Sequence, residues 1–381
     1  MEKLELIATT TFGLEAIVKR EILGLNYKIL KSEDGKITYE GHKSAIAKSN
    51  LWLRCADKVL LKMGEGKVLS FEDLYQLTKS LPWEKWITED GKFTVTGSSV
   101  KSKLFSVPDC QSIVKKAVVD RLSKHYHKEW FAETGAEYTI KITLLKDIAV
   151  LTINTSGSGL HKRGYRVKDV VAPMKETMAS ALVQLSFWNK SRVLIDPFCG
   201  SGTIPIEAAL IERNIAPGLN RKFASENWPA IDKALWEHER KEAFRAIHYA
   251  DDIKILASDM NNHAIQAAKE NAIEAGVDDC ITFRTLPFNK LEIPDPYSII
   301  ICNPPYGERL GDKEALKAIY NDFNRLFSNR KDLSLYLITS DKEFENSFSV
   351  RVPDRRRKLY NGRIETTYYQ YYGEKPPRSF E

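Results

Sequence analysis

The stretch Ser298-Ile299-Ile300-Ile301-Cys302-Asn303-Pro304-Pro305-Tyr306 is the most informative part of this 381-residue chain. Its largely apolar first half predicts a buried central strand. Two prolines cannot continue a β-ladder, so the strand ends there and a rigid loop follows. Ligands bind at the carboxyl ends of strands in open α/β sheets. An amide, fixed carbonyls and an aromatic ring suit a planar, amine-bearing group, although an ordinary strand-ending turn has the same pattern.

A second stretch is typical of a loop that binds a nucleotide-like ligand. Residues 192–195 predict another buried strand, and Asp196-Pro197-Phe198-Cys199-Gly200-Ser201-Gly202-Thr203 follows it directly. A helical pattern begins at Ile204, and glycines between a strand and a helix let backbone N–H groups approach a ligand. Pro205 replaces the third glycine of the dinucleotide fingerprint and the sequence has no P-loop motif, so NAD and ATP fit poorly.

The two motifs together resemble those of the class I S-adenosylmethionine-dependent methyltransferases that methylate amines. With Asn-Pro-Pro-Tyr-Gly-Glu-Arg-Leu-Gly at 303–311, they are similar to the THUMP-containing guanine-N2 RNA methyltransferases, notably the bacterial enzymes for 23S ribosomal RNA. Arg163-Gly164-Tyr165-Arg166 and Ala172-Pro173-Met174-Lys175-Glu176-Thr177 resemble that family's entry into its catalytic domain. The resemblance implies S-adenosyl-L-methionine as cofactor and RNA as partner.

The resemblance also implies an α/β fold: a doubly wound, Rossmann-like class I methyltransferase domain preceded by ferredoxin-like and THUMP α+β domains. The element order fits, because residues 1–62 read as βαββαβ with a hairpin signal at Asp34-Gly35. We expect a THUMP domain at 63–155, a flexible hinge at 156–170 and the catalytic domain at 171–381. The catalytic strands are expected at 192–196, 254–259, 281–285, 298–303, 333–339 and 364–372, with a helical insertion at 213–250.

The chain is basic in one stretch only. Its formal charge is +6, and residues 98–168 alone hold 13 Lys/Arg against 6 Asp/Glu. A basic module ahead of a near-neutral domain favours a polyanionic substrate, although a solvated lysine-rich surface would look the same. Arg355-Arg356-Arg357-Lys358 is a further RNA contact or a charged turn. The predicted RNA-binding residues are Lys101, Lys103, Lys115, Arg121, Lys124, Lys162, Arg163 and Arg166.

The carboxylate after the second predicted catalytic strand, Asp259, is placed to accept both ribose hydroxyls of a cofactor, or to cap the helix at 261–271. The resemblance assigns the glycine loop to the methionine part of the cofactor. It also leads us to expect an acid after the third strand, for the adenine amine, and residues 281–287 offer none. The predicted cofactor-binding residues are Lys175, Glu176, Thr177, Asp196, Phe198, Gly200, Ser201, Gly202, Thr203, Asp259 and Met260.

The predicted catalytic residues are Asn303, Pro304, Pro305 and Tyr306. The Asn303 side-chain oxygen and the Pro304 carbonyl would accept the two N–H bonds of an exocyclic amine, while Tyr306 stacks on the base. The motif fits guanine and adenine equally, and only the resemblance favours guanine N2. Ribosomal RNA is the expected substrate; transfer RNA, adenine N6 or a non-enzymatic assembly role are the alternatives.

Composition excludes several classes of protein. No apolar run approaches membrane length, and the start of the sequence lacks a basic-then-apolar signal. The five cysteines have no Cys-x-x-Cys spacing, which argues against a zinc site or a disulfide framework. We therefore expect a cytoplasmic protein without a metal.

Overall fold

The computed structural model describes residues 2–168, 173–249, 253–293, 295–306, 312–362 and 364–377. The chain folds into two compact units that are each discontinuous in sequence. Unit 1 comprises Met1–Thr10, Val18–Leu160 and Arg221–Glu242, and unit 2 comprises Thr11–Ile17, His161–Asn220 and Ala243–Glu381.

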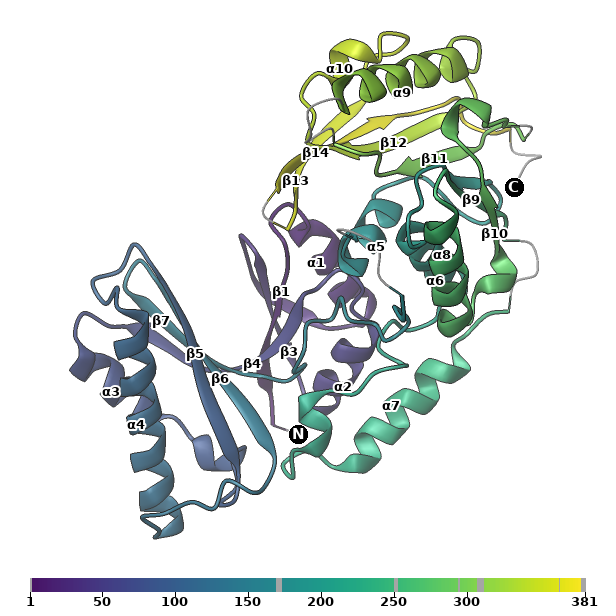
Figure 1. The fold of residues 1–381 in the computed structure, drawn as a ribbon. Helices are drawn as coiled ribbons and strands as arrows, with labels where there is room; N and C mark the ends of the chain where they lie inside the picture. Colours follow the sequence, from purple (N-terminus) through teal and green to yellow (C-terminus); the bar gives the residue numbers. More distant parts are fainter. Residues whose placement is uncertain are drawn as a thin grey trace. The chain divides into compact units, whose positions relative to one another are not determined.

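One seven-stranded sheet runs through unit 1 in the order β2-β3-β1-β4-β7-β6-β5 (Figure 1). Its predicted amino-terminal and THUMP halves are therefore not separate sheets, because β4 pairs with β1 on one side and with β7 on the other. Only β5 and β6 are parallel; the other pairs are antiparallel. The strands are β1 (Leu4–Thr9), β2 (Lys28–Glu33), β3 (Lys36–Gly41), β4 (Lys58–Lys67), β5 (Lys92–Val100), β6 (Glu137–Leu145) and β7 (Ile148–Asn154).

The helices of unit 1 have clear local signals. A capping box between Ser70 and Asp73 starts α3 (Phe71–Ser80), and a proline stands in the first turn of α4 (Val107–Tyr126). These two helices lie side by side, and α4 packs against β5 (Figure 1). The others are α1 (Glu15–Gly24), which begins in unit 2, α2 (Lys43–Trp52) and α7 (Lys233–Arg245), which ends in unit 2.

The predicted insertion at 213–250 contains a short 3-10 helix (Ala224–Asn227) and α7, and its central part belongs to unit 1. Arg221 donates hydrogen bonds to the carbonyls of Gly159 and Ser158, at 2.6 and 3.0 Å. The Ser225 hydroxyl donates to the Thr155 carbonyl at 2.8 Å. The segment 221–242 thus completes a unit whose other residues precede it by sixty positions or more.

The predicted hinge at 156–170 alternates between buried and exposed residues as far as residue 168. Ser156 is fully buried and donates to Asn50, and Leu160 is buried in the same unit. Arg163 and Tyr165 are each 3% exposed in unit 2, whereas Ser158 is exposed in unit 1. The flexibility expected of this stretch stays a prediction; residues 169 and 170 lie outside the described residues.

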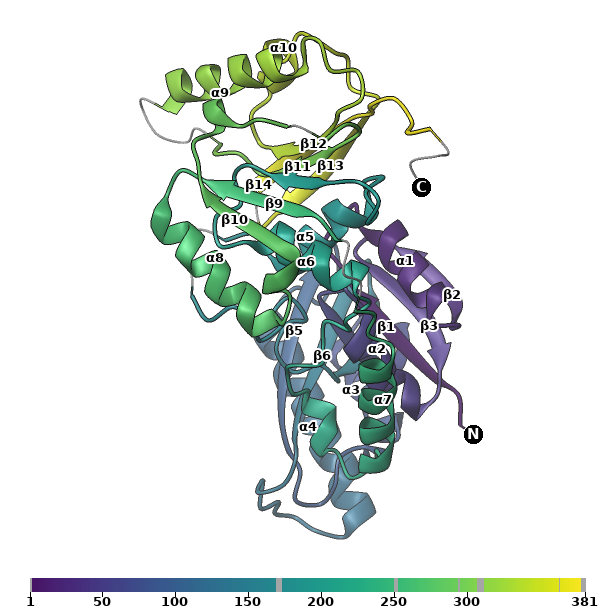
Figure 2. The same cartoon turned by 90° about the vertical axis from the view of Figure 1, so that its right-hand side faces the viewer.

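The sheet of unit 2 has the order β10-β9-β8-β11-β12-β14-β13 (Figure 2). Five strands are parallel and the last two antiparallel, which confirms the doubly wound prediction. The strand order reverses between β8 and β11. The strands are β8 (Leu194–Asp196), β9 (Ile255–Asp259), β10 (Ile281–Thr285), β11 (Ile299–Cys302), β12 (Ser334–Thr339), β13 (Arg355–Asn361) and β14 (Ile364–Tyr371).

Helices cover both faces of this sheet. On one face lie α5 (Glu176–Gln184), α6 (Thr203–Glu212) and α8 (Asn262–Ala275), and on the other lie α9 (Asp312–Phe327) and α10 (Phe344–Ser347) (Figure 2). An aromatic core that includes Phe323, Phe344 and Phe348 fills the second interface. Among the described helices, none is long and apolar enough to cross a membrane.

Strand β13 is absent from the sequence prediction. It contains Arg355–Lys358, so the interpretation of these cations as a charged turn is wrong. β13 pairs along its full length with β14 at the edge of the sheet, while Leu359 is buried. Cations are common on edge strands because they prevent edge-to-edge association, and here they hide the strand pattern.

Candidate active site

The two motif loops meet where the strand order reverses. β8 and β11 pair in parallel, with Ile300 opposite Ile195, so Asp196 and Asn303 follow the same edge of the sheet. Two cavities open there and share Phe198 and Asn303. The smaller, about 170 Å³, is lined by Pro173, Met174, Asp196, Phe198, Cys199, Gly200, Ser201, Thr203, Ile204 and Asn303. The larger, about 380 Å³, is lined by Pro197, Phe198, Asp259, Met260, Pro287, Phe288, Asn289, Asn303, Pro305, Ala318, Ile319 and Asp322.

Asn303 carries the clearest ligand signal of the site. Its Oδ1 atom is buried, and no hydrogen-bond donor in the described parts of the chain reaches it. A buried acceptor without a partner is costly, by about 1–3 kcal/mol. Asn303 lines both cavities, so a donor on a bound molecule is the natural partner of this oxygen.

The other residues of the Asn-Pro-Pro-Tyr motif extend this loop. Pro304 is buried and Pro305 is exposed at the rim of the larger cavity. Tyr306 is half-buried, and its hydroxyl accepts a hydrogen bond of 3.4 Å from Nδ2 of Asn361. The remainder of the quoted motif, 307–311, lies outside the described residues.

The glycine loop needs glycine at two positions. Gly200 has φ +52° and nothing stands within 4 Å of a β-carbon built on it, so its backbone faces open space beside the smaller cavity. Gly202 is the N-cap of α6 with φ +82°, and a β-carbon there would approach Ala268 Cβ to 3.0 Å. A residue with a β-carbon pays about 1–2 kcal/mol for this left-handed conformation, and at Gly202 the close approach to Ala268 adds to that cost.

Asp259 ties the loop to β9. Its carboxylate accepts from the Gly200 amide at 3.0 Å and from the Asn261 amide at 2.9 Å. The alternative role as the cap of α8 is wrong, because Asn261 is the N-cap and accepts from His263 at 2.9 Å. Asp259 and its exposed neighbour Met260 line the larger cavity.

The acids and thiols nearest the smaller cavity are unsuited to carry charge. Burial raises the pKa of the Asp196 carboxyl well above its usual range, despite a hydrogen bond from the Phe198 amide. Burial likewise raises the pKa of the Cys199 and Cys302 thiols. Neither cysteine is therefore an activated nucleophile.

Two arginines predicted to bind RNA lie in the interior of unit 2 instead. Arg163 is 3% exposed and pairs with the buried Glu207 of α6, so burial excludes it from RNA contact. The guanidinium of Arg166 bonds Glu176 at 2.9 Å, the hydroxyls of Ser201 and Thr203 at 3.2 Å each, and the Met174 carbonyl at 2.9 Å. Arg166 thus holds the glycine loop, and these bonds replace the RNA contact predicted for it.

Three residues predicted to bind the cofactor lie at the start of α5. Glu176 is buried and held by Arg166, and burial raises the pKa of its carboxyl. Thr177 is 2% exposed, and Lys175 is the exposed N-cap residue of α5. None of the three lines either cavity, and Glu176 is linked to the glycine loop through Arg166.

The remaining predicted RNA contacts are mostly exposed. Lys101, Lys103, Lys115 and Lys124 lie exposed in unit 1, the last two on α4. Lys162 is exposed in unit 2. Arg121 is an exception, because Glu84 binds its guanidinium and neutralises its charge.

Sequence reasoning missed the far wall of the larger cavity. Phe288 and Asn289 lie in a turn after β10, and Ile319 and Asp322 come from α9. The signal was available, because Pro287-Phe288-Asn289 follows the third catalytic strand, as Asn-Pro-Pro-Tyr follows the fourth. An aromatic ring, Phe288, and an amide, Asn289, stand at the point where an acid was expected.

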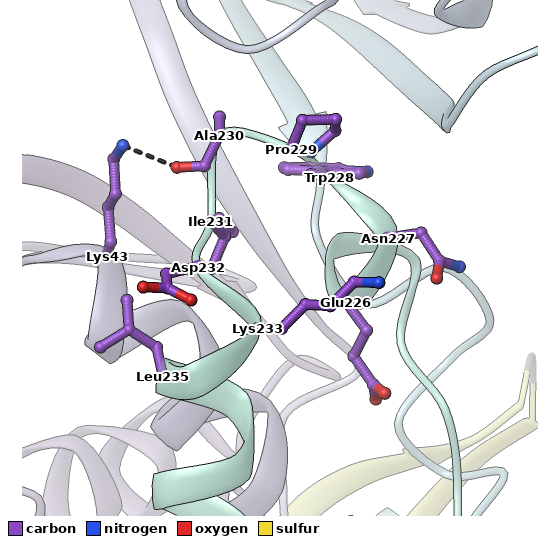
Figure 3. Close-up of a pocket in the computed structure, with 10 residues that line it drawn as sticks. All are labelled: Lys43, Glu226, Asn227, Trp228, Pro229, Ala230, Ile231, Asp232, Lys233 and Leu235. Carbon is purple, nitrogen blue, oxygen red and sulfur yellow. Dashed lines mark hydrogen bonds between the residues drawn. The ribbon is translucent and has the colours of Figure 1, made fainter.

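The most voluminous cavity described, about 730 Å³, lies elsewhere and contains none of the predicted site residues (Figure 3). It belongs to unit 1, where Lys43 donates to the Ala230 carbonyl at 2.6 Å. Its walls are mainly the backbone turn at 226–235, and no orphaned polar side chain marks it. Nor do the residues described contain a cluster of three or more His, Cys, Asp or Glu side chains able to hold a metal.

Comparison with protein families gives three consecutive matches. Residues 5–60 match the RlmL ferredoxin-like domain, residues 69–154 match the THUMP domain, and residues 163–370 match the RMKL-like methyltransferase domain.

Individual proteins are similar over the whole chain. YpsC of Bacillus subtilis (strain 168), a candidate RNA methyltransferase, is 47% identical over 380 residues, 99% of this chain and 98% of its own. A Listeria monocytogenes structure described as a predicted N6-adenine-specific DNA methylase is 47% identical with a TM-score of 0.93, covering 98% of this chain and 97% of its own. SMU.472, a candidate methyltransferase solved with SAH, is 40% identical with a TM-score of 0.93, covering 99% of this chain and 100% of its own.

Proposed function

The chain belongs to the family that joins an RlmL ferredoxin-like domain, a THUMP domain and an RMKL-like methyltransferase domain, and we propose that it methylates the exocyclic N2 amine of a guanosine in 23S ribosomal RNA. The cofactor is S-adenosylmethionine, in line with the SAH-bound relative SMU.472. The observation that carries the proposal is the buried Oδ1 of Asn303, a residue that lines both cavities and whose oxygen receives no hydrogen bond from the described parts of the chain.

The residues around Asn303 fit S-adenosylmethionine. The open backbone at Gly200 admits a ligand against the loop, and Asp259 keeps acceptor capacity on the side of the larger cavity. Phe288 offers an apolar wall, and Asn289 an amide, for a purine ring. When bound, the cofactor supplies a methyl group on a cationic sulfonium, which is already a strong donor.

The chain's own task is to position a weak nucleophile. The lone pair of a guanine amine is delocalised into the ring, and accepting its N–H bonds on Asn303 Oδ1 and the Pro304 carbonyl directs that lone pair out of the ring plane. The Tyr306 ring holds the base by stacking, worth about 1–3 kcal/mol. Positioning of this kind provides much of the rate, and the methylated amine then loses its proton to water.

The exposed lysines of unit 1 supply the affinity for RNA in this proposal. Lys101, Lys103, Lys115 and Lys124 suit phosphate contacts, which fix a nucleic acid without reading its sequence. The target base lies within a stack in duplex RNA, so we expect an unpaired or flipped-out guanosine in RNA that is not yet covered by proteins.

Adenine N6 is the competing acceptor, because Asn-Pro-Pro-Tyr serves either amine and the Listeria relative carries an adenine-specific name. Transfer RNA is the competing substrate. The match to the THUMP domain and the similarity to a candidate RNA methyltransferase favour RNA over DNA, and the family resemblance favours guanine over adenine.

Nucleoside mass spectrometry tests the proposal. Wild-type enzyme with labelled S-adenosylmethionine and deproteinised ribosomal or transfer RNA should give labelled N2-methylguanosine in the ribosomal RNA. Asn303→Ala should lower the rate about 100-fold or more, as loss of a preorganised contact does. As a matched control, Asn289→Ala should act through cofactor affinity and leave the rate at saturating cofactor within a few-fold. Label in methyladenosine, in ribose or in protein would disprove the proposed product.

A further inference from the structure

A second aromatic surface adjoins the proposed base-binding loop within unit 2. The Asn361 side chain donates a hydrogen bond to the Tyr306 hydroxyl, so the end of β13 lies at the edge of that ring. Tyr360, the preceding residue, packs edge-to-face against Phe12, with ring centres 6.0 Å apart and an interplanar angle of 74°. The surface defined by Phe12, Tyr360 and Lys358 is called the hairpin surface below.

The backbone is built to hold Phe12 there. Gly13 has φ +92°, and a β-carbon on it would meet the Lys358 carbonyl oxygen at 2.8 Å. Glycine is therefore required for the segment 11–17 to approach β13 so closely. The approach leaves Phe12 48% exposed and Tyr360 half-buried, so part of the aromatic pair faces solvent.

Cations accompany the two rings. Lys358 Nζ lies 5.6 Å from the centre of the Tyr360 ring and pairs with the exposed Glu365 at 2.6 Å. Arg356, two residues earlier on the same side of β13, pairs with the half-buried Glu345. Exposed ion pairs of this type are weak and exchange readily with a stronger anion.

Aromatic rings interleaved with cations next to a base-binding loop are suited to single-stranded nucleic acid. A target base that leaves its stack also exposes the face of its neighbour, which then needs a new stacking partner. Resting on the proposed function, we propose that the hairpin surface stacks the unpaired nucleotide adjacent to the modified guanosine.

A fluorescent RNA tests this directly. The probe is a short single-stranded RNA of uridines around one guanosine, with 2-aminopurine immediately 3′ or, in a second probe, 5′ of it. Stacking on the wild-type protein should quench the 2-aminopurine in at least one probe. Phe12→Ala combined with Tyr360→Ala should abolish most of the quenching and raise Kd about tenfold, without changing the salt dependence, because stacking releases no counterions.

Two further variants separate stacking from misfolding. Phe12→Trp with Tyr360→Trp should restore quenching, because it keeps large rings. Phe244→Ala removes another exposed ring, 65% accessible on α7, and should bind as wild type. Affinity for SAH should be equal in all variants.

The outcomes distinguish this inference from the proposed function. If wild type quenches neither probe, or if the double alanine variant quenches and binds as wild type does, the hairpin surface is not a stacking site. If N2-methylguanosine forms in that case, the proposed function stands without it. Quenching that depends on both rings supports the surface even when mass spectrometry finds the methyl group on a different base.

Discussion

Asp259 borders the larger cavity and also accepts hydrogen bonds from the Gly200 and Asn261 amides. A single substitution therefore affects both the cavity and the loop. We expect Asp259→Ala to weaken SAH binding by about 1.5–3 kcal/mol, the range for hydrogen bonds to a charged group. Asp259→Asn keeps one acceptor for the loop and should lose less. Titration calorimetry measures both, and equal affinity of wild type and Asp259→Ala would rule out the ribose contact.

Asp196 should cost stability at neutral pH. Its folded-state pKa is raised by burial, so the folded state holds its proton more tightly than the unfolded chain does. Stability from this group is therefore full below the unfolded pKa of about 3.9 and falls as pH rises toward the folded value. Asp196→Asn removes the buried charge and should raise the free energy of unfolding at pH 7.

The advantage of Asp196→Asn should shrink as the pH is lowered, because the wild-type carboxyl then becomes neutral as well. Urea unfolding at several pH values measures this. A variant that is less stable than wild type at pH 7 would show that the ionised form is well solvated in the fold. Affinity for SAH, followed in parallel, reports whether the charge serves the cofactor.

For single residues, the sequence predicts the positions of side chains that follow strands, but not of those whose partners are distant in the sequence. Asp196, Asp259 and Asn303 stand at strand ends, a position that local pattern reveals. Arg163 looked like an RNA contact because its neighbours are basic, yet its partner Glu207 is 44 residues away on α6. Charge along the sequence does not report which cation is buried.

Turning to elements, the start of α6 offers a matched pair of glycines. Gly202→Ala should destabilise the protein by about 2 kcal/mol, because a left-handed conformation is combined with a 3.0 Å approach to Ala268. Gly200→Ala meets nothing within 4 Å and should cost about 1 kcal/mol. Urea unfolding measures both.

For SAH affinity we expect the opposite order, with Gly200→Ala losing more than Gly202→Ala. A methyl group on Gly200 points into open space beside the smaller cavity, so Gly200→Ala should reduce SAH affinity more than its stability loss suggests. If Gly200→Ala binds SAH as wild type does, the cofactor does not approach this part of the loop.

The elements themselves were largely readable, since the doubly wound strands fall within one or two residues of their predicted limits. Two features were not. β13 carries four successive cations and pairs only with β14, and β4 joins two predicted domains in one sheet through β7. Both depend on pairing between strands, which the local spacing of apolar residues does not reveal.

For the whole molecule, we expect RNA affinity and cofactor affinity to separate. Replacing Lys101, Lys103, Lys115 and Lys124 with alanine should weaken RNA binding and lower its salt slope by up to about 3.6, since each phosphate contact contributes about 0.7–0.9. SAH affinity should not change. Filter binding at several salt concentrations provides the slope.

A charge-matched control separates the effect of these four lysines from that of net charge. The exposed lysines Lys190, Lys254, Lys269 and Lys290 all belong to unit 2, and their replacement removes the same net charge. If the control lowers the slope as much as the unit 1 variant does, net charge rather than the THUMP lysines governs RNA binding.

Because unit 1 is discontinuous in sequence, it cannot finish folding until its last segment has been synthesised. Residues up to Leu160 leave the ribosome first, but the segment Arg221–Glu242 that satisfies their terminal carbonyls follows later. At bacterial synthesis rates of about 5–20 residues per second, the gap lasts roughly 4–16 s. During that interval residues up to Leu160 form an incompletely folded unit that chaperones and proteases can reach. A fragment ending at residue 160 would stay in that condition permanently.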